Sequence, residues 1–387
     1  MPSSEQRIAD VASQAVHDAG AEIVTCVPAP GASQVFEAAR ALKARHWPYS
    51  LHPETAYTIA MGASLVGARA CALLSVHAFA KACNAALDSL ACGVQGGLVA
   101  LAFDDRLSRL SESLVDTAAL LNGWGVPHSF PEPADIYDEI AEGFGKSEMK
   151  GLPFAIVLDA DGLARNAVFE RRRAAAPRRN YERDPSQNCL GPFFAAYQKE
   201  AIEVKRAGGD RRRMARPPAP PAADAAPPEW RPCLERLGPI FEELRRVRGA
   251  FVAADAGPLS LFALPPFDCV DAAAHQSSSL PLAVGAAAAG ARNVWAVTTA
   301  LAFAASGHLG LAEADARGLV LKTLVIRDPS LEPESDPIDA ALARLSRNNA
   351  ATVKCGSSLQ RLRTALKDAA AADQTRVLIA DLRPARS

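Results

Sequence analysis

The sequence predicts an α/β protein with two doubly wound parallel-sheet domains and a linker between them. Apolar runs of strand length alternate with longer helical patterns along most of the chain, for example over 71–76, 81–92 and 98–103. Strands that alternate with helices at this spacing are typical of a parallel sheet with helices on both faces. A break in composition separates two such stretches, and 387 residues are enough for two or three domains.

The overall composition is that of an ordinary globular protein, with 49% hydrophobic and 22% charged residues. A net charge of −1 gives no electrostatic reason to expect nucleic acid or an anionic membrane as a partner. The polar N-terminus lacks the apolar core of a signal peptide, and no apolar stretch is long and helix-like enough for a membrane span. We therefore expect a soluble, cytoplasmic protein.

The eight cysteines are scattered, and none forms a Cys-x-x-Cys pair. The sequence therefore predicts neither a zinc site nor a ferredoxin-type iron–sulfur cluster. Several of the cysteines lie in apolar runs, where cysteine behaves as a small buried hydrophobic residue in a reducing compartment.

The chain opens with an amphipathic helix expected at 5–20, whose apolar residues recur on one face. A buried strand is expected at 22–27, followed by a loop that contains Pro28 and Gly31. Proline and glycine are common turn formers, so this loop needs no further function to explain its composition. A second helix is expected at 34–44.

Glu54 stands immediately before a helix expected at 56–66, whose alanines, glycine and serine let another backbone approach closely. The apolar runs described above follow this helix, and we expect the first domain to cover 1–168. Its remaining elements are a polar loop at 106–113, helices at 114–121 and 134–145, and a strand at 154–158.

Residues 169–230 are rich in Pro, Arg and Ala, and apart from a short helix expected at 192–205 they hold little that can bury a core. We interpret them as an interdomain linker, partly extended and partly disordered. The arginine clusters also suggest an RNA-binding arm, but aromatic residues that stack on bases are sparse, which favours a solvated linker.

A second alternating domain is expected over 231–387. Its Ala- and Gly-rich part is interrupted by polar residues and proline, and is better interpreted as buried helix than as a membrane span. Its clearest elements are helices at 234–247 and 360–371 and strands at 250–254 and 377–381.

Glu54, the following AYTIAMGASLVGARA and the later NAALDSLACGVQGGLVALAFDD resemble the pyrimidine-binding domain of thiamine-diphosphate-dependent enzymes. The likeness is greatest to the indolepyruvate:ferredoxin oxidoreductase alpha subunit, and then to phosphonopyruvate and sulfopyruvate decarboxylases. In these enzymes a glutamate at this place hydrogen-bonds N1′ of the aminopyrimidine and promotes the imino tautomer, which removes the thiazolium C2 proton. The resemblance assigns that role to Glu54.

The second domain resembles the diphosphate-binding domain of the same enzymes. The resemblance lies in the sequence order of its features, which are Asp255 with Gly257, the run ALPPFDCVDAAA, a Ser-rich turn and a helix start at SGHLGL. The resemblance implies two doubly wound domains of the thiamine-diphosphate-binding fold joined by the Pro/Arg/Ala-rich linker. It also implies a homodimer, thiamine diphosphate with Mg²⁺ as cofactor and a small-molecule substrate. An oxidoreductase would need a second subunit, because no iron–sulfur domain follows in this sequence.

The resemblance also suggests individual site residues. His77 follows an apolar strand and falls on a histidine of the related oxidoreductases. His77 and His275 are the candidates for proton handling. The alternative for His77 is a buried histidine of the core. Glu54 is also explained as an acid at a helix N-terminus, and Ser277 as an ordinary helix cap. The candidate cofactor-binding residues are Pro28, Gly31, Glu54, Asp255, Gln276, Ser277, Thr299 and Ala300.

The sequence departs from the family where the metal should bind. Catalytic members carry Gly-Asp-Gly or Gly-Asp-Ser after a strand and an asparagine further on, since Mg²⁺ prefers oxygen ligands. Here AVTTALAF stands in that place, with Thr299 and Ala300 at the Gly-Asp pair and Pro329 at the asparagine. Asp328 and the hydroxyls of Thr298 and Thr299 are the possible replacement ligands.

Two functions therefore remain open. The first is a thiamine-diphosphate-dependent enzyme acting on a 2-oxo acid, as a decarboxylase or as an oxidoreductase of the alpha-subunit type. The second is a relative with a degenerate diphosphate site that serves a structural or regulatory role or binds another ligand. Glu54 favours the first, whereas Ala300 and Pro329 favour the second. The sequence contains no hydrolase nucleophile elbow, Walker motif or Gly-x-Gly-x-x-Gly.

Overall fold

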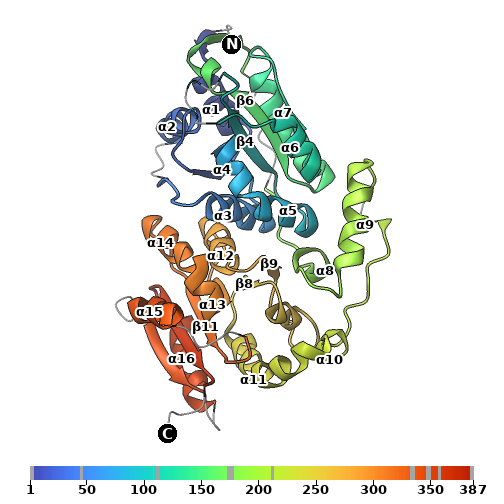
Figure 1. The fold of residues 1–387 in the computed structure, drawn as a ribbon, viewed down its shortest axis with the longest axis vertical. Coiled ribbons are helices and arrows are strands. Elements are labelled where there is room, and N and C mark those ends of the chain that lie inside the picture. The colour runs from blue at the N-terminus through green and yellow to red at the C-terminus, as the bar shows by residue number, and fades with distance from the viewer. Residues whose placement is uncertain are drawn as a thin grey trace. The chain divides into compact units, whose positions relative to one another are not determined.

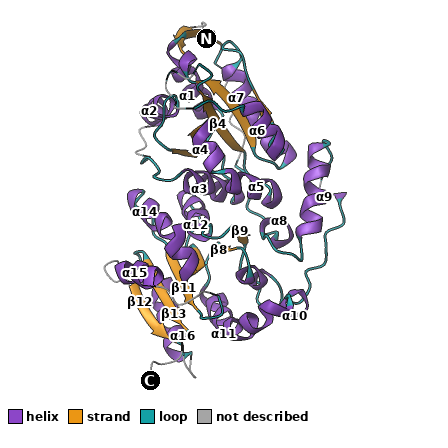
Figure 2. Ribbon diagram, in the orientation of Figure 1, coloured by secondary structure: helices purple, strands orange, loops and turns teal. Residues whose placement is uncertain are grey.

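The protein forms two compact units in the computed structural model (Figure 1). The first consists of Met1–Glu182 with Ala201–Met214, and the second of Arg183–Glu200 with Ala215–Ser387. Helices and strands alternate in both (Figure 2). The structure describes residues 4–43, 47–107, 109, 111, 113–171, 178–210, 213–331, 336–345, 350–355 and 359–383.

The first unit contains a five-stranded, fully parallel sheet in the order β2-β3-β4-β6-β5. The central strands read as continuous apolar runs because both of their faces are covered. Since all strands run in one direction, their carboxyl ends meet at one edge, where ligands bind in open sheets of this type. The strands are β2 Ile23–Cys26, β3 Ala70–Ser75, β4 Leu98–Asp104, β5 His128–Ser129 and β6 Phe154–Asp159.

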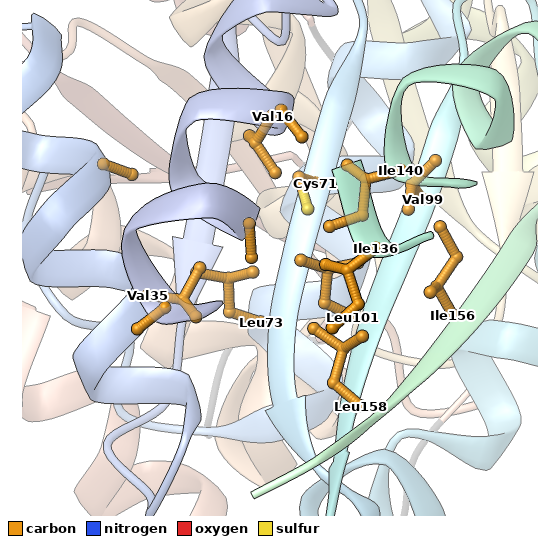
Figure 3. Packing of buried hydrophobic residues seen from close by; sticks show 14 of the residues in the cluster. Val16, Val35, Cys71, Leu73, Val99, Leu101, Ile136, Ile140, Ile156 and Leu158 are labelled. Carbon is orange, nitrogen blue, oxygen red and sulfur yellow. The ribbon is translucent and has the colours of Figure 1, made fainter. Parts of the chain in front are cut away.

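Helices cover both faces of this sheet. Side chains from α1, α2 and α7 pack on one face (Figure 3), with Val16, Val35, Ile136 and Ile140 against Cys71, Leu73, Val99, Leu101, Ile156 and Leu158. An antiparallel pair of short strands, β1 Ser4–Arg7 and β7 Asn166–Phe169, lies outside the sheet. The helices are α1 Ile8–Asp18, α2 Ala32–Lys43, α3 Pro53–Leu65, α4 Val76–Lys81, α5 Cys83–Cys92, α6 Thr117–Trp124 and α7 Ile136–Lys150, with a 3₁₀ turn η1 at Asp161–Ala164.

Helix α3 lies against β2, β3 and β4, and every residue in it except Glu54 is buried. Its small residues, which the sequence suggested for close backbone contact, allow this burial on all sides. The helix expected at 56–66 is confirmed as α3, although it begins three residues earlier, at Pro53, and therefore includes Glu54 in its first turn.

The second unit contains a six-stranded parallel sheet in the order β12-β13-β11-β10-β8-β9. Its strands are β8 Val252–Asp255, β9 Ala272–Ala274, β10 Trp295–Thr299, β11 Lys322–Arg327, β12 Ala350–Lys354 and β13 Arg376–Asp381. Its helical segments are α11 Arg231–Val247, η4 Pro258–Ala263, α12 Ser279–Ala288, α13 Ala300–Ala302, η5 Phe303–Gly307, α14 His308–Ala316, α15 Asp336–Leu345 and α16 Gln360–Ala371.

The stretch expected to be a linker is more ordered than its composition indicated. Cys189, Phe194, Ala222 and Ala226 are buried in the core of the second unit. Arg183 pairs with the fully buried Asp271, which anchors the start of this stretch. The helix expected at 192–205 is confirmed as α9, while 172–177 and 211–212 lie outside the described residues. The helical segments here are α8 Pro185–Asn188, α9 Ala195–Arg206, α10 Ala222–Ala225 and η3 Pro228–Trp230.

The boundaries at residues 168 and 230 stay a prediction, because 183–200 groups with the second unit and 201–214 with the first. Within the described ranges, no helix has both the length and the apolar character to cross a membrane.

Candidate functional site

Glu54 occupies the first turn of α3, in the first unit. His52 is the N-cap, with an extended backbone at φ −137° and ψ 130°, and Pro53 fills the first helical position. Proline is favoured there because the missing N–H would have no partner in the helix, and an acid in the first turn is favoured by the helix dipole. The local sequence thus places the Glu54 carboxyl, half-buried, at the N-terminal end of an otherwise buried helix.

Two contacts between α3 and α5 hold this region together. The side-chain amide of Asn84 donates from Nδ2 to Oε1 of Glu54 over 3.1 Å. One turn further on, the buried hydroxyls of Tyr57 and Ser89 lie 3.0 Å apart, and the Tyr57 ring stacks on Phe79 of α4. The position of the Glu54 carboxyl is therefore fixed by two helices. Asn84 was not predicted, because a lone asparagine in a small-residue helix carries no recognisable signal.

His77 lies two residues beyond the end of β3, in α4, and is exposed. Its Nε2 is 2.8 Å from Oγ of Ser113. Helix α4 starts there because Ser75 is its N-cap and accepts a hydrogen bond from the N–H of Ala78 over 3.2 Å. The alternative interpretation of His77 as a core histidine is wrong, since the side chain faces solvent at the ligand-binding edge of the sheet.

Sequence reasoning missed two further polar residues, namely His52, two residues before Glu54, and Lys81, whose charge acts on His52. Burial lowers the pKa of the His52 imidazole, the Lys81 ammonium lowers it further, and the Glu54 carboxylate acts in the opposite direction. Both charges are therefore close enough to His52 to influence its protonation. His52 also lies 3.5 Å from the hydroxyl of Thr55, measured from Nδ1.

The loop with Pro28 and Gly31 follows β2 at the same edge of the sheet. Gly31 has φ +79°, and a Cβ atom there would come within 2.8 Å of the Phe103 ring. Both the backbone conformation and the packing therefore require glycine. Pro28 is exposed. These observations explain the loop as a tight turn, and its expected part in cofactor binding stays a prediction.

Asp255 ends β8 in the second unit and is buried. Its Oδ1 accepts a hydrogen bond from the N–H of Ser279 over 2.9 Å, and its Oδ2 accepts one from the Thr298 hydroxyl over 2.7 Å. Burial raises the pKa of the Asp255 carboxyl, while these hydrogen bonds and the nearby His275 act in the opposite direction. Asp255 thus ties the start of α12 to the end of β10.

The turn between β9 and α12 contains His275, Gln276 and Ser277. His275 is buried, Gln276 is exposed, and Ser277 has a left-handed backbone with φ +72°. The Ser277 hydroxyl donates to the carbonyl oxygen of Ala302 over 2.7 Å, so it joins the turn to α13. The alternative of an ordinary helix cap is therefore wrong for Ser277.

Thr299 and Ala300 occupy the end of β10 and the start of α13. The Thr299 hydroxyl is the N-cap of α13 and accepts a hydrogen bond from the N–H of Ala302 over 3.1 Å. The Ala300 side chain is a fully buried methyl group. Helix α13 continues through the π-helical turn η5 into α14 without a break. A π-helical turn is frequent near functional sites, but no side chain at this helix start replaces the aspartate of the metal signature.

Asp328, the possible replacement ligand, is fully buried and already engaged. It accepts from Nε of Arg236 over 3.0 Å and from the N–H and hydroxyl of Ser330 over 2.9 and 2.8 Å. In the part of the chain that the structure describes, no group of three or more His, Cys, Asp or Glu residues lies close enough to hold a metal ion. Because the carboxylates of Asp255 and Asp328 serve the protein itself, the residues present do not fit Mg²⁺.

The residues at the expected pyrimidine site, in contrast, do fit the cofactor. The Glu54 carboxyl is half-buried, oriented by Asn84 and placed at the ligand-binding edge of a parallel sheet. These are the properties needed to accept a hydrogen bond from a protonated ring nitrogen. The expected pyrimidine-binding residue in the first unit therefore fits the cofactor, whereas the expected metal ligands in the second unit do not.

Comparisons with known proteins agree with the fold. No protein-family model and no curated protein matches the sequence. Among solved structures, the chain is similar to the thiamine diphosphate-dependent 4-hydroxybenzoylformate decarboxylase of Rhodococcus jostii RHA1, with a TM-score of 0.66 and 13% identity over 99% of this chain and 100% of that one.

Two further structures are similar over nearly the whole chain. A protein from Mycobacterium smegmatis described as a thiamin diphosphate-dependent enzyme has a TM-score of 0.64 and 14% identity, over 98% of this chain and 100% of that one. Benzoylformate decarboxylase of Polynucleobacter necessarius has a TM-score of 0.64 and 12% identity, over 97% of this chain and 98% of that one.

These likenesses establish that the chain has the fold of thiamine-diphosphate-dependent enzymes, as the sequence predicted. The expectation of two parallel-sheet α/β domains of this fold is confirmed. The particular resemblance to the indolepyruvate:ferredoxin oxidoreductase alpha subunit stays a prediction, since the similar structures named here are decarboxylases or a less closely defined enzyme.

Proposed function

We propose that this protein is a thiamine-diphosphate-dependent enzyme that acts on a 2-oxo acid. The observation that carries the proposal is the Glu54 carboxyl, half-buried and held by Asn84 at the N-terminal end of a buried helix. Simple decarboxylation is favoured over oxidation, because two of the similar structures are named as decarboxylases of benzoylformate and 4-hydroxybenzoylformate.

When bound, thiamine diphosphate supplies a carbanion that adds to the ketone carbon of the 2-oxo acid and takes up the electrons released as carbon dioxide leaves. Glu54 would hold the aminopyrimidine at N1′ and share a proton with it. His77, at 2.8 Å from the Ser113 hydroxyl, and the buried His275 are the candidates for moving protons to and from substrate. The cofactor would be bordered by Pro28, Gly31, Gln276, Ser277, Thr299 and Ala300.

Magnesium forms no part of the proposal, because the carboxylates of Asp255 and Asp328 are bound by other groups of the protein. The diphosphate would have to be held by hydroxyl and backbone N–H groups. Enzymes of this fold pair their two kinds of domain across an interface, so we propose a homodimer. A cytoplasmic location, and a second subunit that accepts electrons if the reaction is oxidative, also belong to the proposal.

The second candidate function is non-catalytic. It is favoured by one observation, the fully buried Ala300 methyl group where catalytic relatives carry a metal-binding aspartate. Such a protein would keep the fold as a structural or regulatory partner, or would bind another ligand at the same sheet edge.

The test is release of carbon dioxide from a panel of 2-oxo acids that includes benzoylformate, 4-hydroxybenzoylformate and indolepyruvate. Each is assayed with thiamine diphosphate in the presence of EDTA and then in the presence of Mg²⁺, with and without a dye that accepts electrons. Turnover that requires the cofactor and is lost in Glu54→Gln supports the proposal. No turnover on any member of the panel by a folded protein supports the second candidate.

A further inference from the structure

Lys81 lies close in the chain to the residue that contacts the proposed catalytic carboxyl. Helix α4 ends at Lys81, and α5 starts at Cys83, so only one residue separates them. Asn84, three residues after Lys81, makes the 3.1 Å hydrogen bond to Glu54. The backbone path from Lys81 to this contact is therefore very short.

His77 and Lys81 lie four residues apart in α4, a spacing that puts both side chains on the same face of a helix. Both are exposed. On the side of α3, His52 precedes Glu54 by two residues and is influenced by the charges of both Lys81 and Glu54. The charge of Lys81 thus acts on a residue beside Glu54 in the chain, and His77 shares a helix face with Lys81.

The Lys81 ammonium forms no ion pair with a carboxylate among the residues that the structure describes. Lys146, within α7 of the same unit, by contrast pairs with Glu139 and Glu142. The Lys81 side chain is exposed, so its charge is available for an external anion.

The substrate class of the proposed function carries such an anion. A 2-oxo acid has a carboxylate directly bonded to the ketone carbon that must lie near the cofactor bound by Glu54. Lys81 matches this carboxylate in charge, and it lies three residues before Asn84, the residue that contacts Glu54.

We propose that Lys81, with His77 on the same helix face, binds the carboxylate of the 2-oxo acid substrate. This inference rests on the proposed function for the identity of the anion. It makes Lys81 a substrate-binding residue that sets selectivity for free acids over their neutral esters.

The experiment compares Lys81→Met, which removes the charge and keeps the length, with Lys81→Arg, which keeps the charge. Lys150→Met is the matched control, because Lys150 is likewise the last residue of a helix in the first unit, at the end of α7. Binding of benzoylformate and of its neutral methyl ester to the full chain is measured by ligand-observed NMR, with and without thiamine diphosphate.

We expect Lys81→Met to weaken benzoylformate binding about tenfold, as for loss of one charge-assisted hydrogen bond, and to leave ester binding unchanged. Lys81→Arg and Lys150→Met should bind both compounds as the unchanged protein does. In Lys81→Met the pKa of His52, followed by NMR, should also rise, because a neighbouring positive charge is lost.

The inference is overturned if Lys81→Met binds the acid normally, if Lys150→Met weakens it equally, or if the unchanged protein binds acid no better than ester. This design distinguishes failure of the proposed function from failure of the inference about Lys81. A selective loss in Lys81→Met without any turnover contradicts the proposed function alone. Turnover with an unaltered KM in Lys81→Met contradicts the inference alone.

Discussion

Asn84 and Glu54 lie 30 positions apart in the sequence, yet the Asn84 amide nitrogen is 3.1 Å from the Glu54 carboxyl oxygen. Each is the second residue of its helix, α5 and α3 respectively. The contact orients the carboxyl of Glu54, the one residue of α3 that is not buried. The proposed function depends on that carboxyl.

Replacing Asn84 by Ala should weaken thiamine diphosphate binding without unfolding the protein. The Glu54 carboxyl loses one of the hydrogen bonds that orient it, at a cost of about 1 kcal/mol, or roughly fivefold in affinity. Titration calorimetry of Asn84→Ala beside Gln95→Ala, an exchange of another amide side chain in the same unit, checks this. Equal affinities for the two variants would show that Asn84 does not support the site.

Replacing Glu54 by Gln should reduce turnover of a 2-oxo acid by about 100-fold or more, since an amide cannot share a proton with the aminopyrimidine. Unfolding by urea should change little, because Glu54 is only half-buried at the end of its helix. Undiminished turnover in Glu54→Gln would remove this residue from the mechanism.

Introducing the metal ligands found in thiamine-diphosphate-dependent enzymes should create a dependence on Mg²⁺. The double variant Ala300→Asp, Pro329→Asn supplies the carboxylate and amide oxygens that the cation prefers. We expect its affinity for thiamine diphosphate to rise when Mg²⁺ replaces EDTA, whereas the unchanged protein shows no such rise. An unaltered response to Mg²⁺ would indicate that the diphosphate end has diverged beyond these two positions.

Stability in acid should depend on Asp18. Burial alone would raise the pKa of this carboxyl, but hydrogen bonds from Arg171, Tyr137 and His17 outweigh burial and hold it below its ordinary value. A carboxyl with a lowered pKa in the folded state stabilises the fold above its unfolded pKa, near 4, and this contribution is lost as the pH falls through the folded value.

The Arg171→Met variant tests this dependence. Arg171 donates to Asp18 over 2.6 and 2.7 Å, so its loss should move the midpoint of acid unfolding to higher pH. Arg178→Met, which removes a more open pair with Glu22 at 3.4 Å, should move it less. Circular dichroism during an acid titration measures both midpoints, and equal shifts would contradict the role given to Asp18.

The main features of the fold followed from periodicity. The apolar runs at 71–76 and 98–103 are long enough for strands and too continuous for a solvent-facing sheet, and they became β3 and β4. The segment 178–230 was harder to predict, because its Arg, Pro and Ala content suggests a solvated chain. Its order comes from distant partners, such as the pairing of Arg183 with Asp271 across 88 positions.

The site was predictable only where one residue carried a strong local signal. Glu54 stands in a recognisable stretch, whereas Asn84, His52 and Lys81 gain their importance from contacts that no short motif encodes. Asp328 illustrates the same limit. From the sequence it was a possible metal ligand, but Arg236, 92 positions earlier, occupies its carboxylate.

The most direct measurement is calorimetric titration of the purified protein with thiamine diphosphate, in EDTA and then in Mg²⁺, with Glu54→Gln as the control. We expect saturable binding of one cofactor per chain in EDTA, little change on adding Mg²⁺, and strongly weakened binding in Glu54→Gln. Absence of binding to the folded protein under both conditions would contradict the assignment of a thiamine-diphosphate-dependent enzyme.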